Sequence, residues 1–408
     1  MRILYLHQYF KFPNEPGGTR SFDLASGFLG LGHKVEILTT TSDDTYKSKK
    51  RWLKIEKDGL IIHYIYLPYT NHMSYLKRSI IFFKFLWFSS LKLLSLKGDL
   101  LLATSTPLTI GVPALLKKWI HKTPFIFEAR DIWPEVVIAI GAVESKIYQR
   151  ILYLLESTIY KNAAAIVPLS TDMKQSIISR YPKLANKSIE VIENISEIDR
   201  FQSGYNEQKY VLKKKIGFKP RFTVLYAGTF GRVNEIDYVI ELAAKTIHHD
   251  PKLVFILIGE GAEKQNVINQ AIHKGILNKN VFIFDSVSKL ELPQLYFECS
   301  MGSSFVAPIK ELWANSANKF FDTLAAGRPI LINHKGWQEE QIYKENIGYV
   351  LPENIDDEAI KNFLIYSQNK ELITEQNKNS LNVAKKKYAT RIAVWKYNRI
   401  FENIFCDT

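Results

Sequence analysis

Short apolar runs alternate with longer amphipathic stretches along almost the whole chain. Ile3 to Leu6 is the first apolar run, a helical spacing of apolar residues follows from Arg20 to Leu31, and Lys34 to Thr39 is apolar again. Strand, loop, helix and strand in this order are typical of a βαβ unit that opens a parallel sheet. Further strands of the same kind are predicted to end near residues 104, 127, 169 and 194.

The pattern repeats after a polar stretch from Ser196 to Gln208, where we place the domain boundary. Further apolar runs in the second half cover residues 222–226, 253–258, 280–284, 301–307 and 330–332. A chain of 408 residues is too long for one hydrophobic core. The pattern therefore predicts an α/β protein with two Rossmann-like domains that face each other across a cleft. We expect domains over 1–200 and 201–385, and a helix over 386–408 that crosses back to the first domain.

Polar residues gather at the predicted carboxyl ends of the strands, where open parallel sheets bind their ligands. Gly17 and Gly18 precede the first helix and allow a ligand to approach the backbone closely. The stretch from Glu128 to Glu135 contains three acids, one arginine and one tryptophan, and Asp131 is its central acid. This stretch is a candidate site; a solvated loop with local ion pairs is the alternative interpretation.

A glycine-rich turn opens the second half, with Gly228, Gly231 and Arg232 at a predicted helix start. Such a turn is typical of an anion-binding site. Its spacing departs from the fingerprint G-x-G-x-x-G, so the sequence does not support NAD binding. Two further predicted strands end at Gly259 and just before Ser286, at the same expected edge of the sheet.

A helix over residues 317–326 is predicted by the stretch N-S-A-N-K-F-F-D-T-L-A-A-G-R-P, with Asn315 and Ser316 as its N-cap residues. Lys319 and Asp322 share one face of this helix because they lie three residues apart. The helix N-terminus and Lys319 suit a phosphate, and Asp322 suits sugar hydroxyls. A surface ion pair on an amphipathic helix is the alternative.

The chain is basic, with 54 Lys and Arg against 41 Asp and Glu and a net charge of +13, which indicates an anionic partner. From Tyr75 to Leu96, basic residues such as Lys77 and Arg78 are mixed with large apolar ones, and no acid occurs before Asp99. This composition favours a helix at an anionic lipid surface, while a helix packed on the sheet is the alternative. We expect no nucleic-acid partner, because no recognised nucleic-acid module accompanies the charge.

Cys299 and Cys406 provide neither a disulfide framework nor a metal-ligand cluster, so a reducing compartment is expected. The first residues read as a strand and lack the features of a signal peptide. No apolar stretch reaches the ~18 residues that a membrane-spanning helix needs. We therefore expect a cytoplasmic protein that binds the inner membrane surface peripherally.

Seven motifs, in an order and spacing that cover nearly the whole chain, carry a resemblance to a known family. They are H-Q-Y-F with G-G-T-R, L-G-H-K-V, T-S-T-P-L-T-I-G, E-A-R-D-I-W-P-E, Y-A-G-T-F-G-R, I-G-E-G and the stretch ending in L-A-A-G-R-P. The chain resembles retaining glycosyltransferases of the GT-B fold, in the large bacterial group that builds polysaccharides on lipid carriers. Within that group it is most similar to the N-acetylfucosamine transferases of O-antigen and capsule synthesis.

The resemblance implies transfer of a sugar from a UDP-sugar to a polyprenyl-diphosphate-linked saccharide, without a metal or another cofactor. The sugar is expected to be an N-acetylated hexosamine or a deoxy form of one. The alternatives are a non-catalytic partner protein that keeps the fold, and a GT-B sugar-nucleotide epimerase. Binding of a nucleotide sugar distinguishes an enzyme from a scaffold, and retention on anionic liposomes distinguishes a lipid-linked acceptor from a soluble one.

The resemblance also assigns residues. The implied donor-binding residues are Gly17, Gly18, Gly228, Gly231, Gly259, Ser286, Val287, Asn318 and Asp322, and the implied catalytic residues are Asp131, Lys319, Arg232 and Glu135. Lys319 would neutralise the leaving diphosphate in place of a metal, and Asp131 would assist the acceptor hydroxyl. Asp322 stands where the family has the second glutamate of its E-x7-E motif. The first falls on Ala314, so the grip on the donor sugar departs from that of the family.

Overall fold

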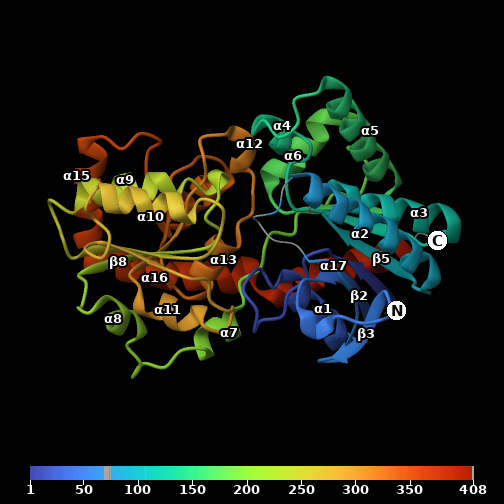
Figure 1. Cartoon of the computed structure of the whole chain (residues 1–408), viewed down its shortest axis with the longest axis horizontal. Helices are drawn as coiled ribbons and strands as arrows, with labels where there is room; N and C mark the ends of the chain where they lie inside the picture. The colour runs from blue at the N-terminus through green and yellow to red at the C-terminus, as the bar shows by residue number, and fades with distance from the viewer. Residues whose placement is uncertain (69–72, 74, 106, 407–408) are drawn as a thin grey trace.

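The computed structural model describes residues 1–68, 73, 75–105 and 107–406, with the backbone alone for residues 75–79. The side chains of Lys77 and Arg78, Thr106 of the T-S-T-P-L-T-I-G motif and residues 407–408 of the predicted final helix lie outside the described residues. The chain forms two lobes, each built on a twisted sheet with helices on both faces (Figure 1). The predicted pair of Rossmann-like α/β domains is confirmed.

The first domain contains a seven-stranded sheet in the order β3-β4-β2-β1-β5-β6-β7. Its strands are β1 (Arg2–Leu6), β2 (Lys34–Thr41), β3 (Trp52–Lys57), β4 (Leu60–Tyr66), β5 (Leu100–Thr104), β6 (Phe125–Ala129) and β7 (Ala165–Pro168). All neighbours pair in parallel except β3 and β4, which form an antiparallel hairpin at the edge. The central strands are mostly apolar and almost entirely buried because helices cover both of their faces.

Helices of the first domain cover the two faces of this sheet in different groups. They are α1 (Arg20–Gly30), α2 (Tyr75–Ser95), α3 (Gly111–His121), α4 (Glu135–Ala139), α5 (Lys146–Asn162) and α6 (Thr171–Arg180). One core contains apolar residues of α1, and the core on the opposite face contains residues of α2, α3 and α5. Among the described residues, no helix combines the length and the apolar character that crossing a bilayer requires.

The second domain contains a six-stranded parallel sheet in the order β10-β9-β8-β11-β12-β13. Its strands are β8 (Phe222–Ala227), β9 (Leu253–Ile258), β10 (Val281–Phe284), β11 (Met301–Ser304), β12 (Ile330–Ile332) and β13 (Gly348–Val350). Its helices are α7 (Ile198–Ser203), α8 (Val211–Ile216), α9 (Ile236–Thr246), α10 (Lys264–His273), α11 (Leu292–Glu298), α12 (Lys310–Trp313), α13 (Asn318–Ala325), α14 (Trp337–Glu345), α15 (Asp357–Gln368) and α16 (Lys370–Val383).

The end of the chain returns to the first domain. A π-helical turn (Ala384–Tyr388) joins α16 to α17 (Thr390–Cys406), and α17 lies along α1 (Figure 1). The helices meet closely because Gly27 has no side chain; a Cβ atom there would lie 2.3 Å from Val394. Tyr397 and Phe401 of α17 pack edge-on against Phe28 of α1. The last helix therefore completes the core of the first domain.

Candidate active site

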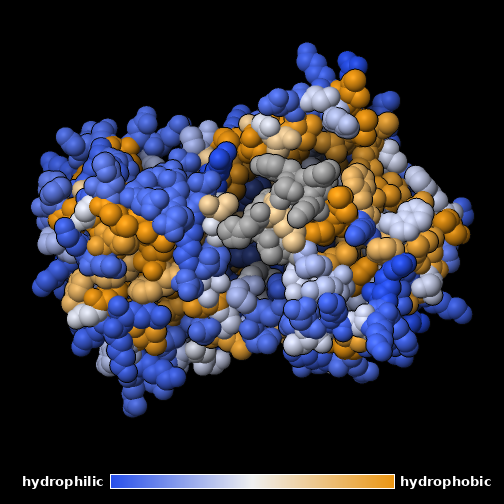
Figure 2. Space-filling model, in the orientation of Figure 1, coloured by the Kyte–Doolittle hydropathy of each residue, from blue (hydrophilic) through white to orange (hydrophobic). Residues whose placement is uncertain are grey.

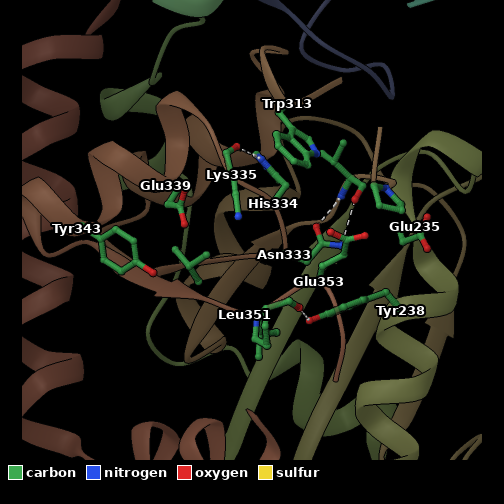
Figure 3. A pocket seen from close by; sticks show the side chains of 14 residues that line it. Glu235, Tyr238, Trp313, Asn333, His334, Lys335, Glu339, Tyr343, Leu351 and Glu353 are labelled. Atoms are coloured by element: carbon green, nitrogen blue, oxygen red, sulfur yellow. Dashed lines mark hydrogen bonds between the residues drawn. The ribbon is translucent and has the colours of Figure 1, made fainter. Parts of the chain in front are cut away.

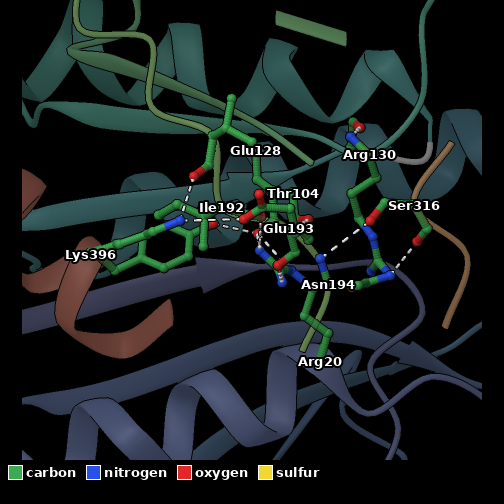
Figure 4. Close-up of polar contacts among 12 residues, drawn as sticks. Arg20, Thr104, Glu128, Arg130, Ile192, Glu193, Asn194, Ser316 and Lys396 are labelled. Carbon is green, nitrogen blue, oxygen red and sulfur yellow. Dashed lines mark hydrogen bonds and ion pairs between the residues drawn. The ribbon is translucent and has the colours of Figure 1, made fainter. Parts of the chain in front are cut away.

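The predicted helix over residues 317–326 is α13, and its N-cap residue is Ala317, without a side-chain capping bond. The prediction that Asn315 and Ser316 cap this helix is wrong. The hydroxyl of Ser316 accepts a hydrogen bond from the backbone of Asn194, and the Asn194 amide donates to the Ser316 carbonyl at 2.5 Å (Figure 4). Ser316 cannot cap α13 because it is engaged with the first domain, so the helix N-terminus faces an open space.

That space is a cavity of about 450 Å³ lined by residues of both domains. Nine of the residues implied by the resemblance line it: Gly17, Gly18, Gly228, Gly259, Ser286, Val287, Asn318, Lys319 and Asp322. They come from a loop after β1, from the carboxyl ends of β8, β9 and β10, and from the start of α13. The structure thus brings together residues that lie up to about 300 positions apart at the expected edge of the sheet.

Glycines let the two domains meet at this cavity. A Cβ atom on Gly18 would lie 2.4 Å from the side-chain amide nitrogen of Asn318, across the cleft. On Gly228 it would lie 3.2 Å from the ammonium of Lys319. Gly17 has φ +127°, a backbone conformation that side chains disfavour. The small residues at these positions therefore let the first loop and the glycine-rich turn after β8 lie close to α13.

Lys319 is a cation at the cavity wall without an ion-pair partner among the described residues. Its ammonium donates to the side-chain oxygen of Asn234 at 3.2 Å and lies 5.0 Å from the centre of the Tyr226 ring. Burial lowers the pKa of Lys319 to about 8, and Asp322 opposes this change. A poorly neutralised ammonium beside a helix N-terminus favours the binding of an anion such as a diphosphate.

Asp322 lies deeper in the cavity and is paired with a residue that the sequence did not indicate. The Lys289 ammonium lies 2.5 Å from its carboxylate, and both side chains are more than nine-tenths buried. Burial raises the pKa of Asp322, and the charge of Lys289 opposes this. The backbone amides of Lys289 and Leu290 donate to the carbonyls of Glu15 and Pro13 in the first domain. This loop therefore both pairs with Asp322 and closes the cleft.

A second cavity of about 340 Å³ adjoins the first and shares Gly18 and Asn318 with it. Asp131 lines this second cavity, together with Arg130 and His7. Burial, assisted by the charge of Arg130, lowers the pKa of His7 to about 3, so the imidazole is neutral at physiological pH. His7 belongs to the H-Q-Y-F motif, but no sequence pattern marked it as a site residue. A carboxylate and a neutral imidazole beside the first cavity can orient a hydroxyl group and its proton.

Three predicted residues line neither cavity: Gly231, Arg232 and Glu135. The Arg232 side chain is 91% exposed and pairs with Glu263 at 3.1 Å, because the turn before α9 points it outward. Glu135 starts α4 and lies 2.7 Å from Arg180, which also pairs with Glu156. Burial raises the pKa of Glu135 to about 7. The described residues contain no group of three or more His, Cys, Asp or Glu placed to hold a metal ion.

Both halves of the chain match known sequence families. Residues 209–382 match the family described as glycosyl transferases group 1, and residues 17–200 match glycosyltransferase family 4. Spore coat protein SA of Bacillus subtilis is 23% identical over 199 residues, which cover 47% of this chain and 52% of that protein. An uncharacterized glycosyltransferase of Methanocaldococcus jannaschii is 25% identical over 240 residues, covering 58% and 55%. The chain spans about half the length of these curated relatives.

Solved structures share the fold over the whole chain. Sucrose-phosphate synthase from Thermosynechococcus elongatus superposes with a TM-score of 0.76 at 13% identity, covering 100% of both chains. The structure of Anabaena HepE in complex with UDP-glucose gives a TM-score of 0.70 at 15% identity, again over 100% of both chains. The chain therefore has the GT-B fold. With both of its halves matched, it is related to the group 1 glycosyltransferases.

Proposed function

We propose that the protein is a retaining, metal-independent glycosyltransferase that uses a UDP-sugar and a polyprenyl-diphosphate-linked saccharide of O-antigen or capsule synthesis. The observation that carries the proposal is the ammonium of Lys319, which lies without an ion-pair partner among the described residues beside the N-terminus of α13. These groups provide positive charge for a diphosphate inside a partly enclosed cavity. HepE, which has the same fold, is solved with UDP-glucose.

In the proposed reaction the bond between the anomeric carbon and the diphosphate oxygen breaks, and the acceptor oxygen bonds to that carbon on the same face. The proton of the acceptor hydroxyl passes to an oxygen of the leaving diphosphate. Lys319 and the first amides of α13 stabilise the charge that develops on this group. Asp131 lies in the adjoining cavity, where it orients the acceptor hydroxyl.

The deeper part of the cavity suits the nucleoside. Asp322, held by Lys289, offers carboxylate oxygens to the ribose hydroxyls, while the chain at Ser286 and Val287 lines the wall for the base. Ala314 provides no carboxylate for the donor sugar. This supports an altered or deoxygenated sugar, as in the family branch that the motifs resemble.

The outer surface of the first domain supports a membrane partner. Ile80, Phe83, Trp87 and Leu91 of α2 are exposed at intervals of three and four residues, so they form one stripe. A second exposed stripe on α5 consists of Ile147, Ile151 and Leu154. Figure 2 shows apolar surface over this part of the molecule. We name this surface the α2–α5 face.

Charge identifies the lipid that suits the α2–α5 face. Exposed Lys84, Lys146 and Arg150 accompany the two apolar stripes, α2 contains no acid, and the acid of α5, Glu156, is buried. Apolar side chains with basic neighbours bind at the interface of anionic bilayers. The proposed location is therefore the inner face of the cytoplasmic membrane, where a polyprenyl-linked acceptor would be presented to the cleft.

Thermal unfolding with UDP, GDP, ADP, CDP and dTDP in turn tests the donor site. At ~100 times its dissociation constant, UDP should stabilise the protein by about 2.7 kcal/mol. Lys319→Ala should lose this stabilisation while unfolding cooperatively without ligand. Lys274→Ala, which removes the exposed lysine directly after α10, is the matched control and should keep it. Failure of every nucleotide to stabilise the wild type would favour a non-catalytic partner protein instead.

Sedimentation with liposomes tests the membrane proposal. The double variant Phe83→Ser/Trp87→Ser removes side chains that are 70% and 63% exposed, so little core packing is lost. It should bind vesicles of anionic lipid far more weakly than the wild type, because less apolar area enters the interface. Ile272→Ser, at a 59% exposed position of the second domain, is the control. Equal binding of all three proteins to the vesicles would exclude the α2–α5 face as the membrane-binding surface.

A further inference from the structure

A third cavity, of about 240 Å³, lies at the same edge of the second sheet but on its other half. It is formed where β11, β12 and β13 end and where α9 and α14 begin. Figure 3 shows Glu235 and Tyr238 of the α9 region on one side of it and Glu339 and Tyr343 of α14 on the other. It shares no lining residue with the two cavities of the cleft. We name it the α9–α14 cavity.

The α9–α14 cavity has an excess of hydrogen-bond acceptors without partners. The carboxylates of Glu235, Glu339 and Glu353 line it, and none of them has an ion pair or a side-chain hydrogen bond among the described residues. Glu235 is also held at φ +46°, a conformation that costs energy for a residue with a side chain. Burial raises the pKa of Glu235. Glu235 and Glu339 are half-buried and Glu353 is exposed, so all three keep oxygen atoms that a ligand can reach.

His334 supplies an independent indication of a ligand. Its side chain is 4% exposed, and its Nδ1 atom lies 2.8 Å from the carbonyl of Lys335 and must donate to it. Burial lowers the pKa of His334 to about 4, so the neutral ring presents Nε2 as an acceptor. This Nε2 atom and the indole nitrogen of Trp313, which also lines the cavity, are both buried without a partner. The cavity therefore contains unfilled acceptors and one unfilled donor.

The lining restricts the chemical class of the ligand. Three carboxylates face a single cation, Lys335, which disfavours phosphates and nucleotides. The described residues form no metal-binding group, so a bare divalent cation does not fit. The rings of Tyr238, Trp313 and Tyr343 provide apolar walls. A ligand that combines many O–H donors with flat apolar faces matches this lining, and that combination is typical of a sugar ring.

We propose that the α9–α14 cavity is a saccharide-binding site, separate from the donor and acceptor cavities of the cleft. It accepts an uncharged or basic sugar residue, whose hydroxyls donate to Glu235, Glu353 and His334. The ring of the bound sugar packs against Tyr343 and Trp313. The site stands whether or not the cleft transfers sugars, because none of its residues belongs to the cleft.

Saturation-transfer NMR with glucose, N-acetylglucosamine and chitobiose tests the site, with UDP present to fill the donor cavity. The full-length protein should saturate the ring protons of at least one of these sugars. The double variant Tyr343→Ala/Glu353→Gln should bind that sugar with an affinity lower by about tenfold or more. Both side chains are exposed at the cavity mouth, so the variant should fold normally.

Two controls separate this site from others. Tyr210→Ala removes a tyrosine that is 56% exposed outside the cavity and should bind the sugar as the wild type does. Asp131→Asn alters the cleft and should also leave the signal unchanged. A signal lost in Asp131→Asn but kept in Tyr343→Ala/Glu353→Gln would overturn the proposal. So would the absence of any signal at millimolar sugar, or binding of spermidine without binding of any saccharide.

Discussion

Two enclosed cations, one in each domain, have opposite surroundings. Arg20 in the first domain is 2% exposed, and its guanidinium lies 2.9 Å from the carboxylate of Glu128. Its remaining groups donate to the carbonyls of Ile192 and Glu193 (Figure 4). Tyr397 of α17 donates to the same carboxylate. Within the part of the chain that the structure describes, Lys319 in the second domain has only the amide oxygen of Asn234 and the face of an aromatic ring.

The difference shows which enclosed charge is available to a ligand. Arg20 ties α1 to β6 and to the segment after β7, and each of its three side-chain nitrogens already has a protein partner. Burial lowers the pKa of Lys319, so its ammonium loses a proton more easily than that of an exposed lysine. A bound anion would raise this pKa again. Burial of a charge is therefore not an indication of a binding site by itself. An enclosed charge does indicate a binding site when it lacks ion-pair partners among the described residues.

The largest effect is expected from breaking the filled pair. Arg20→Met should lower the free energy of unfolding by about 3–5 kcal/mol, because it leaves the buried carboxylate of Glu128 without its cation. Urea unfolding measures this. The double variant Arg20→Met/Glu128→Gln should recover part of the loss. Arg232→Met, which removes an exposed pair, is the control and should change the free energy of unfolding by less than about 1 kcal/mol.

The contact that closes the cleft next to Lys319 offers a second test. Gly18→Ala places a methyl group 2.4 Å from the terminal amide of Asn318, which must turn away, so it should destabilise the protein by about 1–2 kcal/mol. Adding Asn318→Ala should restore most of that loss, as measured by the urea midpoint. Gly30→Ala, at a position with no atom within 4 Å, is the matched control and should not destabilise. An unrescued double variant would show that the first loop and the start of α13 do not meet in solution.

Much of this arrangement could be predicted from the sequence. The spacing of apolar residues predicted α1 and most of the parallel strands, because helix and strand periods are properties of local sequence. The strand expected to end near residue 194 is not formed, and β13 was not predicted. The hairpin of β3 and β4 was not predicted. Lys54 and Glu56 of β3 are exposed on this edge strand, so it reads as a charged segment rather than as a strand.

For the site, the sequence predicted where the backbone segments meet but not where the side chains point. Glycines and helix starts at strand ends indicated the cavity, since the topology of a parallel sheet fixes where those ends meet. The directions of side chains depend on the partner domain, which is why Ser316 binds Asn194 instead of capping α13. For the same reason no sequence pattern indicated Lys289, while Arg232 and Glu135 were predicted site residues although they lie in ion pairs outside the two cavities.

The smallest predicted effect concerns the proton of Lys319. Because its pKa in the free protein is about 8, UDP binding should be constant below that pH and weaken above it. The loss should approach tenfold per pH unit, or about 1.4 kcal/mol, until the pKa of the complex is reached. Calorimetric titration between about pH 7 and pH 10 measures this. The folding stability of the free protein should change in the opposite direction and rise with pH above 8. Lys319 has a higher pKa in the unfolded chain, so in this pH range the unfolded chain binds more protons than the folded one.

Lys319→Arg separates this proton from other groups that titrate in the same range. A guanidinium stays charged up to about pH 12, so the affinity of this variant for UDP should not fall between about pH 8 and pH 10. A wild-type profile as flat as that of the variant would mean that Lys319 is as well neutralised as Arg20. The contrast between the two cations would then fail. The diphosphate would have to be held by the amides of α13 and the glycine loops alone, and Lys319→Ala would weaken UDP binding only slightly.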